Sequence, residues 1–351
     1  MEYKHISEID FKGNMNTRVF GIFLAKDVNV RTQKDGKTKF ISLTMCDKGL
    51  ELDTKKFSAS DKDIEDMQNG HVYAAAIDVK PYERASNGIS LTLYNFEEIN
   101  ESPANFVLWA DGMEDAQEII QNALETINES IYNKLVYNVL IRNWQKFCVW
   151  AAATGMHHNV MGGLLVHTAE VIEQSEIIAD FWNDKYGPNF INKPLLLSGA
   201  LLHDIGKTEE LDVDTNCGVI SYSTKASLET HITMCVSMID VEAYKLQLGY
   251  QVYRINEINE QEPVKSEETL QIEQEAVNLL KHLILSHHGK KEYGSPIEAS
   301  CPEASILNMA DGLSAEMFRY NKTLSDMQPF ESSSVWLSGS IQTTYKDSTK
   351  Q

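Results

Sequence analysis

The sequence predicts a multidomain α+β protein in which a small N-terminal β-barrel is followed by an all-α domain. Two observations carry this prediction. Residues 11–100 alternate short apolar runs with turn signals, whereas residues 150–320 repeat apolar side chains at helical spacing. A chain of 351 residues is long enough for two domains of ordinary size. The expected parts are a first domain at 1–100, connecting helices at 101–149, a second domain at 150–325 and a flexible tail at 326–351.

The first domain is expected to contain five short strands, with a small helix between the third and the fourth. Asp35-Gly36 and residues 47–49 are turn signals, and residues 61–67 have the length of one or two helical turns. The strands are expected at 19–24, 40–45, 50–57, 71–79 and 89–96. This pattern is typical of an OB-like barrel, although a generic small β-barrel would also fit it.

After the first domain the apolar residues recur at helical spacing, beginning with a connecting helix over residues 119–139. Pro194 suits the first turn of a helix that runs to Asp204 and is stopped by Gly206. The polar and acidic residues 249–270 predict a mobile insertion. Further helices are expected from near Leu164 and over 225–248, 272–287 and 303–320.

The charge balance restricts the ways in which this chain could bind nucleic acid. The net charge is −20, and residues 1–100 contribute about −2 of it, with 14 Lys and Arg against 16 Asp and Glu. Such a balance argues against tight, sequence-independent coating of DNA. Bound metal ions dominate the field at a site, so an enzyme that holds a few phosphates remains compatible with it.

The sequence gives no sign of membrane association or of export. No apolar run reaches the ~18 residues of a membrane span, and residues 1–11 are too polar for a signal peptide. The five cysteines form no CxxC pair, so free thiols in a reducing compartment are expected. We therefore expect a cytoplasmic protein.

Histidines gather in the second domain, and one of them stands beside an aspartate. His203-Asp204 follows the apolar residues 195–202, so both side chains should be buried, which is costly unless they are satisfied. The C-terminal end of a helix also favours a cation. Imidazole and carboxylate are ligands of Mn, Fe, Zn or Ni, so the pair is a candidate metal site. By its spacing, Lys207 could point its ammonium at a phosphate oxygen.

The other candidate ligands each have a plain structural alternative. Asp311 shares a helix face with Leu307 and Phe318 and needs a partner, which a helix cap or a lysine could supply. His167 alone would more often be a satisfied core residue. The ordered set carries more weight than its members, because each lies on or at the end of a separate expected helix. The set is His167, His203-Asp204, His231, His287-His288 and Asp311.

This ordered set resembles the HD superfamily of metal-dependent phosphohydrolases, whose signature is His…His-Asp…Asp. More closely, it resembles the YhaM-type 3′→5′ exoribonucleases, which also join an N-terminal OB-fold to an HD domain. The resemblance covers most of residues 11–320, and its HD motifs are far more specific than its β part. The segments that carry it are 156–158, 162–168, 198–207, 285–290, 294–296 and 310–315.

Carried over residue by residue, the resemblance implies a set of site residues. Lys207 would hold the scissile phosphate and act in catalysis with Asp204. His157 and His158 match a histidine-rich stretch near the substrate entry, and Lys290 is a further candidate substrate contact. The implied metal ligands are His167, His203, Asp204, His231, His287 and Asp311, with His288 as a second-metal ligand or phosphate contact. The acidic insertion, the tail and the low basic content leave RNA affinity and substrate length open.

The leading hypothesis is hydrolysis of single-stranded RNA with one or two divalent ions, and single-stranded DNA stays open as a substrate. Mn²⁺ is the first candidate, and Fe, Co, Ni and Zn are alternatives. Bases would stack on Phe40, Phe57 or Tyr82, although aromatic residues in strands are more often core. Two alternatives stay open: an HD phosphohydrolase of mononucleotides or cyclic dinucleotides, and a non-catalytic nucleic-acid-binding regulator. A homo-oligomer is compatible with the sequence.

Overall fold

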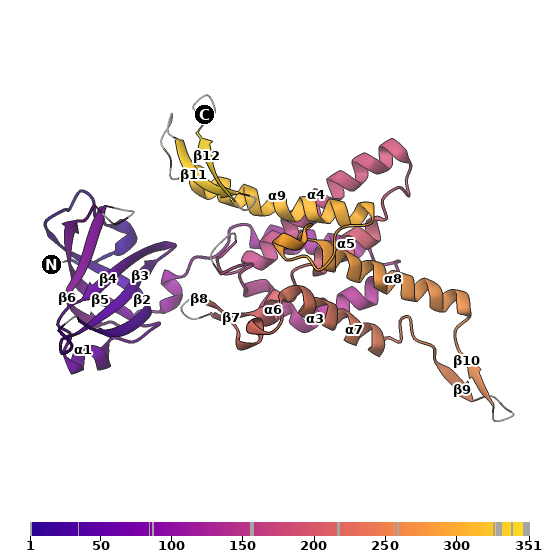
Figure 1. Ribbon diagram of the computed structural model, residues 1–351, viewed down its shortest axis with the longest axis horizontal. Coiled ribbons are helices and arrows are strands. Elements are labelled where there is room, and N and C mark those ends of the chain that lie inside the picture. The colour runs from indigo at the N-terminus through magenta and orange to yellow at the C-terminus, as the bar shows by residue number, and fades with distance from the viewer. Residues whose placement is uncertain are drawn as a thin grey trace. The chain divides into compact units, whose positions relative to one another are not determined.

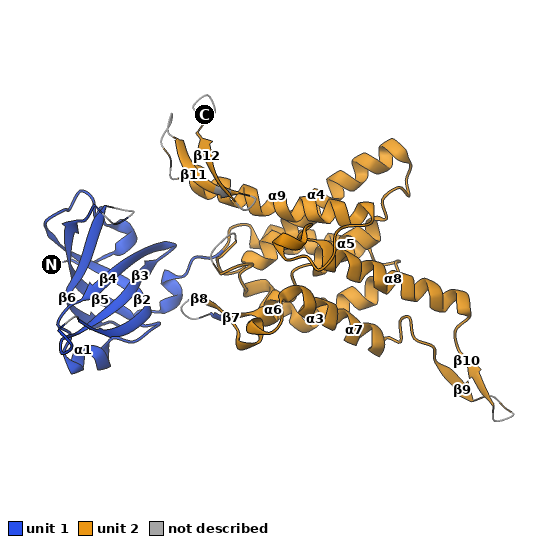
Figure 2. Cartoon of the chain, viewed as in Figure 1, with its two compact units in different colours: residues 1–109, 213–219 blue, residues 110–212, 220–351 orange. Residues whose placement is uncertain are grey.

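The structure is a computed structural model, and its chain forms two compact units. One unit contains residues 1–109 and 213–219, and the other contains residues 110–212 and 220–351 (Figure 2). The first unit therefore extends beyond residue 100 and includes a short segment from the second half of the chain. The described residues are 2–33, 35–83, 85, 88–154, 158–215, 218–255, 257, 260–325, 327, 332–337 and 340–346.

The first unit is built around a closed five-stranded barrel. Strands β2, β3 and β4 pair antiparallel in sequence order, β4 pairs in parallel with β6, and β5 closes the barrel against both β6 and β2. The short β1 pairs with β2. The bounds are Lys4–His5 (β1), Arg18–Thr32 (β2), Lys39–Asp47 (β3), Leu50–Lys56 (β4), Asp61–Asp66 (α1), Val72–Pro81 (β5) and Ile89–Glu98 (β6) (Figure 1). This strand order, with α1 between β4 and β5, is that of an OB-fold and confirms the prediction.

Alternation along the strands places the core inside the barrel. In β3, Ile41, Leu43 and Met45 are at most 3% exposed, and the residues between them face outward. The small helix α1 begins with a capping box. The Ser60 hydroxyl accepts from the Asp63 backbone N–H, and the Asp63 carboxylate accepts from the Ser60 backbone N–H. These local signals explain why the β part could be predicted from the sequence.

The second unit is a bundle of helices around one apolar core. Each of its longer helices contributes to a single cluster of buried apolar side chains, and α4, α5 and α9 pack against one another (Figure 1). No helix in the described ranges is long and apolar enough to cross a membrane. The bounds are Met113–Thr126 (α2), Asn133–Val149 (α3), Gly163–Tyr186 (α4), Lys193–Leu202 (α5), Lys207–Glu210 (α6), His231–Lys245 (α7), Glu267–Ser286 (α8) and Pro302–Ser325 (α9). Between α6 and α7, β7 (Leu211–Asp214) pairs with β8 (Val219–Tyr222).

Helix α5 carries the His203-Asp204 pair at its end. Its N-cap is Asn192, whose side chain accepts a hydrogen bond from the Leu195 backbone N–H, and Pro194 lies in the first turn. The residues from Leu195 to the end of the helix are all buried. The pair therefore emerges from a fully buried helix, as its apolar sequence predicted.

The structure corrects the expected connecting helix and the helix expected over 225–248. Two helices, α2 and α3, replace the single helix over 119–139, because the chain turns between residues 126 and 133. Helix α7 begins only at His231, after a 3₁₀ turn at Thr224–Ser227.

The expected insertion and the expected tail each contain a short hairpin, and their mobility stays a prediction. Within residues 249–270, β9 (Tyr253–Ile255) pairs with β10 (Gln261–Pro263), and the last residues already belong to α8. In the tail, β11 (Ser332–Leu337) pairs with β12 (Ser340–Tyr345) and packs against α9. Val335 and Leu337 are buried, so part of this tail has an apolar reason to stay ordered.

Candidate metal centre

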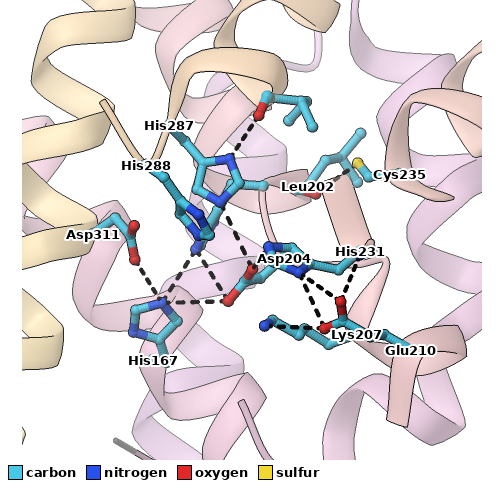
Figure 3. A network of polar contacts seen from close by, with 12 residues as sticks. His167, Leu202, Asp204, Lys207, Glu210, His231, Cys235, His287, His288 and Asp311 are labelled. Carbon is cyan, nitrogen blue, oxygen red and sulfur yellow. Dashed lines mark hydrogen bonds and ion pairs between the residues drawn. The ribbon is translucent and has the colours of Figure 1, made fainter. Parts of the chain in front are cut away.

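Side chains from five helices converge at one place inside the helical unit (Figure 3). Their ligand-type atoms form two groups, and within each group these atoms all lie within 4.8 Å of one another. They come from α4, the end of α5, the start of α7, the end of α8 and the middle of α9. The first group is His167, His203 and Asp311, and the second is His231, His287 and His288.

Asp204 lies between the two groups. Its Oδ2 is 3.7 Å from His167 Nε2 and 3.8 Å from His203 Nε2. Its Oδ1 is 3.4 Å from His231 Nε2 and 3.9 Å from His287 Nε2. One carboxylate therefore turns a different oxygen toward each group, which is the arrangement expected of a ligand that bridges two cations.

Hydrogen bonds at Nδ1 fix how the histidine rings point. The Nδ1 atoms of His203 and His287 lie 2.8 and 2.7 Å from carbonyl oxygens three residues earlier in the chain. His288 Nδ1 lies 3.2 Å from the carbonyl oxygen of Tyr293. A ring that donates from Nδ1 in this way keeps the lone pair on Nε2, the nitrogen that faces the centre, as a metal ligand requires.

The charge states also suit a metal. Burial lowers the pKa of His203, His231 and His287, so these rings are neutral near pH 7. Burial alone would raise the pKa of Asp204, but above all the charge of Lys207 holds it well below its usual range. Neutral imidazoles and an ionised carboxylate are the forms that bind cations.

His167 and Asp311 form a close pair of a histidine and a carboxylate. His167 Nε2 lies 3.2 Å from Asp311 Oδ1. Burial would lower the pKa of His167, but the two aspartates beside it outweigh burial and raise it. Burial would raise the pKa of Asp311, but contact with His167 lowers it. A cation bound by both side chains would replace the proton that they share.

Unsatisfied buried atoms give an independent test of fit. Asp204 Oδ1, His231 Nε2 and His287 Nε2 are buried and have no hydrogen-bond partner. Each such atom typically costs about 1–3 kcal/mol, so three that face one another are unfavourable without an occupant. Imidazole nitrogen and carboxylate oxygen suit divalent transition metals, and the two groups offer places for up to two ions. The residues present therefore fit a divalent metal.

Glu210 belongs to the site, although it was not predicted from the sequence. Its carboxylate accepts the His231 backbone N–H at 2.9 Å, and both of its oxygens lie 3.1 Å from His231 Nδ1. Burial would raise the pKa of Glu210, but the hydrogen bond from His231 and the charge of Lys207 lower it to about 2. Glu210 thus stays ionised and holds His231 Nε2 toward the centre. A Cβ at Gly206 would clash with the His231 carbonyl, so glycine permits this close approach.

We expect Glu210→Gln to weaken the binding of metal by the second group about 10- to 100-fold, because the partner that orients His231 loses its charge. Isothermal titration with Mn²⁺ and metal analysis by mass spectrometry would measure this. Glu209→Gln is the matched control, since Glu209 pairs with Lys225 at a distance of 2.8 Å and does not contact the ligands. Equal metal affinity in the two variants would show that Glu210 does not support the site.

Ser314 and Glu170 orient His167 through a short relay. His167 Nδ1 lies 2.8 Å from Ser314 Oγ, and the Ser314 hydroxyl donates to Glu170 Oε2 at 2.6 Å. Ser314 stands one helical turn after Asp311 and Glu170 one turn after His167, so two helices each supply one ligand and one supporting group. Ser314 follows Asp311 by three residues, but nothing in the sequence indicated its hydrogen bonds.

Lys207 places a positive charge at the edge of the centre (Figure 3). Its Nζ lies 3.2 Å from Glu210 Oε2, and its side chain is 15% exposed. Burial would lower the pKa of Lys207, but the carboxylates of Asp204 and Glu210 raise it, so the ammonium stays charged. The predicted catalytic lysine is therefore near the ligands and fixed in position.

The other predicted substrate contacts in this unit differ from one another. His157 lies outside the described residues. His158 is 1% exposed, and its ring centroid is 4.3 Å from that of Phe318 and 5.2 Å from that of His167. His158 is therefore buried among packing partners, and its contact with substrate stays a prediction. The side chain of Lys290 is 64% exposed and is open to a ligand.

The predicted aromatic contacts lie on the outer surface of the barrel. Phe57 and Tyr82 are 46% and 49% exposed, and Phe40 is half-buried. The rings of Phe40 and Phe57 lie 6.0 Å apart at an interplanar angle of 30°. The alternative that these side chains fill the barrel core therefore does not hold for Phe57 and Tyr82. Contact with bases stays a prediction for all three.

Comparisons with known proteins agree with the motifs. Residues 164–316 match the family model described as HD domain. The 3′-5′ exoribonuclease YhaM of Bacillus velezensis is 28% identical over 316 residues, which cover 88% of each chain. The YhaM enzyme of Bacillus subtilis is 27% identical over 83% of each chain. That of Oceanobacillus iheyensis is 27% identical over 89% of this chain and 88% of its own. These findings confirm the resemblance and the order of a barrel followed by an HD domain.

Proposed function

Because this chain carries an HD domain and matches YhaM exoribonucleases along most of its length, we propose that it is a metal-dependent 3′→5′ exoribonuclease. The observation that carries the proposal is the position of Asp204, with one carboxylate oxygen facing each group of ligands. The substrate is single-stranded RNA, and the enzyme works in the cytoplasm. Free thiols at Cys46, Cys148, Cys235 and Cys301 support a reducing compartment.

The metal would be held by the two groups, with Asp204 shared between them. A divalent ion supplies an activated water nucleophile at neutral pH and compensates negative charge on the phosphate. Mn²⁺ is proposed, because imidazole and carboxylate donors suit it. The second group offers three imidazoles and only one carboxylate oxygen, so it would also bind Fe, Co, Ni or Zn.

The protein residues perform the remaining steps. Lys207 donates an N–H to a phosphate oxygen where negative charge develops during cleavage. Glu210 holds both Lys207 and His231, so the donor and the ligand keep a fixed relation. Since these groups are ordered by their own hydrogen bonds, little rearrangement is needed when substrate arrives.

The barrel would hold the single strand by stacking. Strands β3 and β4 form the face with which OB-folds bind oligonucleotides, and Phe40 and Phe57 lie on this face. Every base has a flat face, so such a platform binds without a sequence requirement. The OB-fold thereby explains why a chain with a net charge of −20 can still bind RNA locally.

The direction of cleavage is tested with RNA labelled at the 5′ end, incubated with the full-length protein and Mn²⁺. A 3′→5′ exonuclease gives a ladder of shortening labelled products, and it leaves circular RNA of the same sequence intact. Circular RNA cleaved at the same rate would contradict the proposal. Rapid hydrolysis of mononucleotides or cyclic dinucleotides with intact RNA would favour the alternative HD phosphohydrolase. Protein that contains no metal and does not cleave RNA when Mn²⁺ is added would favour the non-catalytic regulator.

A further inference from the structure

Tyr94 is an exposed residue at an irregularity in strand β6. Asn95 pairs with Ala76, but Leu93 pairs with Ile77, so Tyr94 is the extra residue of a β-bulge. Bulges of this kind turn a side chain out of the regular alternation and are common beside functional sites. Leu93 is buried, whereas Tyr94 is 57% exposed. A large aromatic ring is thus held on the outside of the barrel.

Arg18 lies over this ring. The guanidinium carbon is 3.6 Å from the centroid of Tyr94. Arg18 Nε and Nη2 donate to the two carboxylate oxygens of Asp78 at 2.6 and 3.0 Å, so the planar group is fixed in one orientation. Because Arg18 covers one face of the ring, the opposite face of Tyr94 is the one available for stacking.

The register of the barrel places Tyr94 beside the Phe40–Phe57 pair. Lys55 of β4 pairs with Thr92 of β6, and Phe57 and Tyr94 each follow two residues later in the chain. The Lys56 ammonium donates to the Tyr94 carbonyl at 3.0 Å, so the end of β4 lies near Tyr94. Phe57 is partnered by Phe40 of β3, so the three aromatic side chains come from the same side of the barrel.

A cavity lies beside Arg18 on the same unit. Its volume is about 420 Å³, and it is lined by Asn16, Thr17, Arg18, Asp78, Val79 and Lys80. Lys80 is exposed and follows Asp78 on the outer face of β5. Since Asp78 compensates Arg18, the free positive charge at this cavity comes from Lys80, which suits a phosphate.

We propose that Tyr94 and Arg18 form an additional nucleotide subsite that extends the Phe40–Phe57 platform. One base of single-stranded RNA stacks on the open face of Tyr94, and an adjoining phosphate contacts Lys80. A planar aromatic ring, a planar cation and a lysine beside a cavity match the base and the phosphate of a nucleotide. This inference rests on the proposed function, because it takes RNA as the ligand.

The test measures binding of the full-length protein with Mn²⁺ to a fluorescent phosphorothioate-linked oligoribonucleotide, chosen to resist cleavage. A length of about 12 nucleotides lies within the ~4–16 that an OB-fold covers. Tyr94→Ala should raise the dissociation constant about tenfold, and Tyr94→Phe should leave it near that of wild type, because stacking needs only the ring. The matched control is Tyr253→Ala in β9, where the tyrosine is 59% exposed.

The subsite would be overturned if Tyr94→Ala bound with unchanged affinity. It would also be overturned if Tyr94→Phe and Tyr253→Ala lost as much affinity as Tyr94→Ala. Thermal unfolding of each variant checks that the barrel still folds. If wild type degrades RNA and Tyr94→Ala binds the oligonucleotide equally well, only the subsite is overturned. If binding depends on Tyr94 but wild type does not degrade RNA, only the proposed function is overturned. If wild type does not bind the oligonucleotide at all, the subsite is also overturned.

Discussion

In an Asp204→Ala variant, the rate of cleavage of labelled single-stranded RNA in Mn²⁺ should fall by more than about 10- to 100-fold. That range is roughly the cost of losing a group that is only hydrogen-bonded to a metal ligand. The reason is that Asp204 turns one oxygen toward each group of ligands, so its removal affects both positions together. Metal analysis should show less bound Mn²⁺ than in wild type. Asp212→Ala is the control, because Asp212 is an exposed aspartate that follows the same motif.

Stability separates this loss of function from simple unfolding. Asp204 Oδ1 is buried without a hydrogen-bond partner, whereas the charge of Lys207 stabilises the ionised carboxylate. Because these two effects oppose each other, thermal unfolding of the metal-free variant beside metal-free wild type serves to check that the variant folds. Added Mn²⁺ should raise the melting temperature of wild type more than that of the variant, because only tight binding to the native state stabilises it. Undiminished cleavage by Asp204→Ala would contradict the proposed metal-dependent mechanism.

The sequence predicted the ligands better than it predicted what holds them. His203-Asp204 could be recognised because polar side chains at the end of a fully apolar helix need a partner. The contacts of His231 with Glu210 and of His167 with Ser314 join residues on different elements. Such contacts depend on how helices pack, and helical periodicity does not encode packing.

The same limit explains why the tail hairpin and the burial of His158 were not predicted. The Ser- and Thr-rich tail lacks a long apolar pattern, yet Val335 and Leu337 suffice to pack its hairpin against α9. His158 was placed near the substrate by its motif, but its burial depends on Phe318, far along the chain. In contrast, the barrel strands were predicted from local alternation and turns, because these signals are contained within each strand.

Lys207→Ala should lower kcat about 10²- to 10³-fold, the usual cost of removing one donor that stabilises charge in a transition state. The ammonium is held by Glu210 at 3.2 Å and remains charged because the neighbouring carboxylates raise its pKa. Lys225→Ala is the control, because Lys225 forms an ion pair with Glu209, which lies on α6 like Lys207.

The metal content of Lys207→Ala decides what the lysine does. Removal of a positive charge near Asp204 lowers the electrostatic repulsion of a bound cation, so the variant should bind Mn²⁺ at least as well as wild type. A fall in kcat with undiminished metal therefore identifies Lys207 as a group that acts on substrate. Loss of metal in parallel with loss of activity would instead make Lys207 a structural support for Glu210 and His231, and the phosphate would then need another donor.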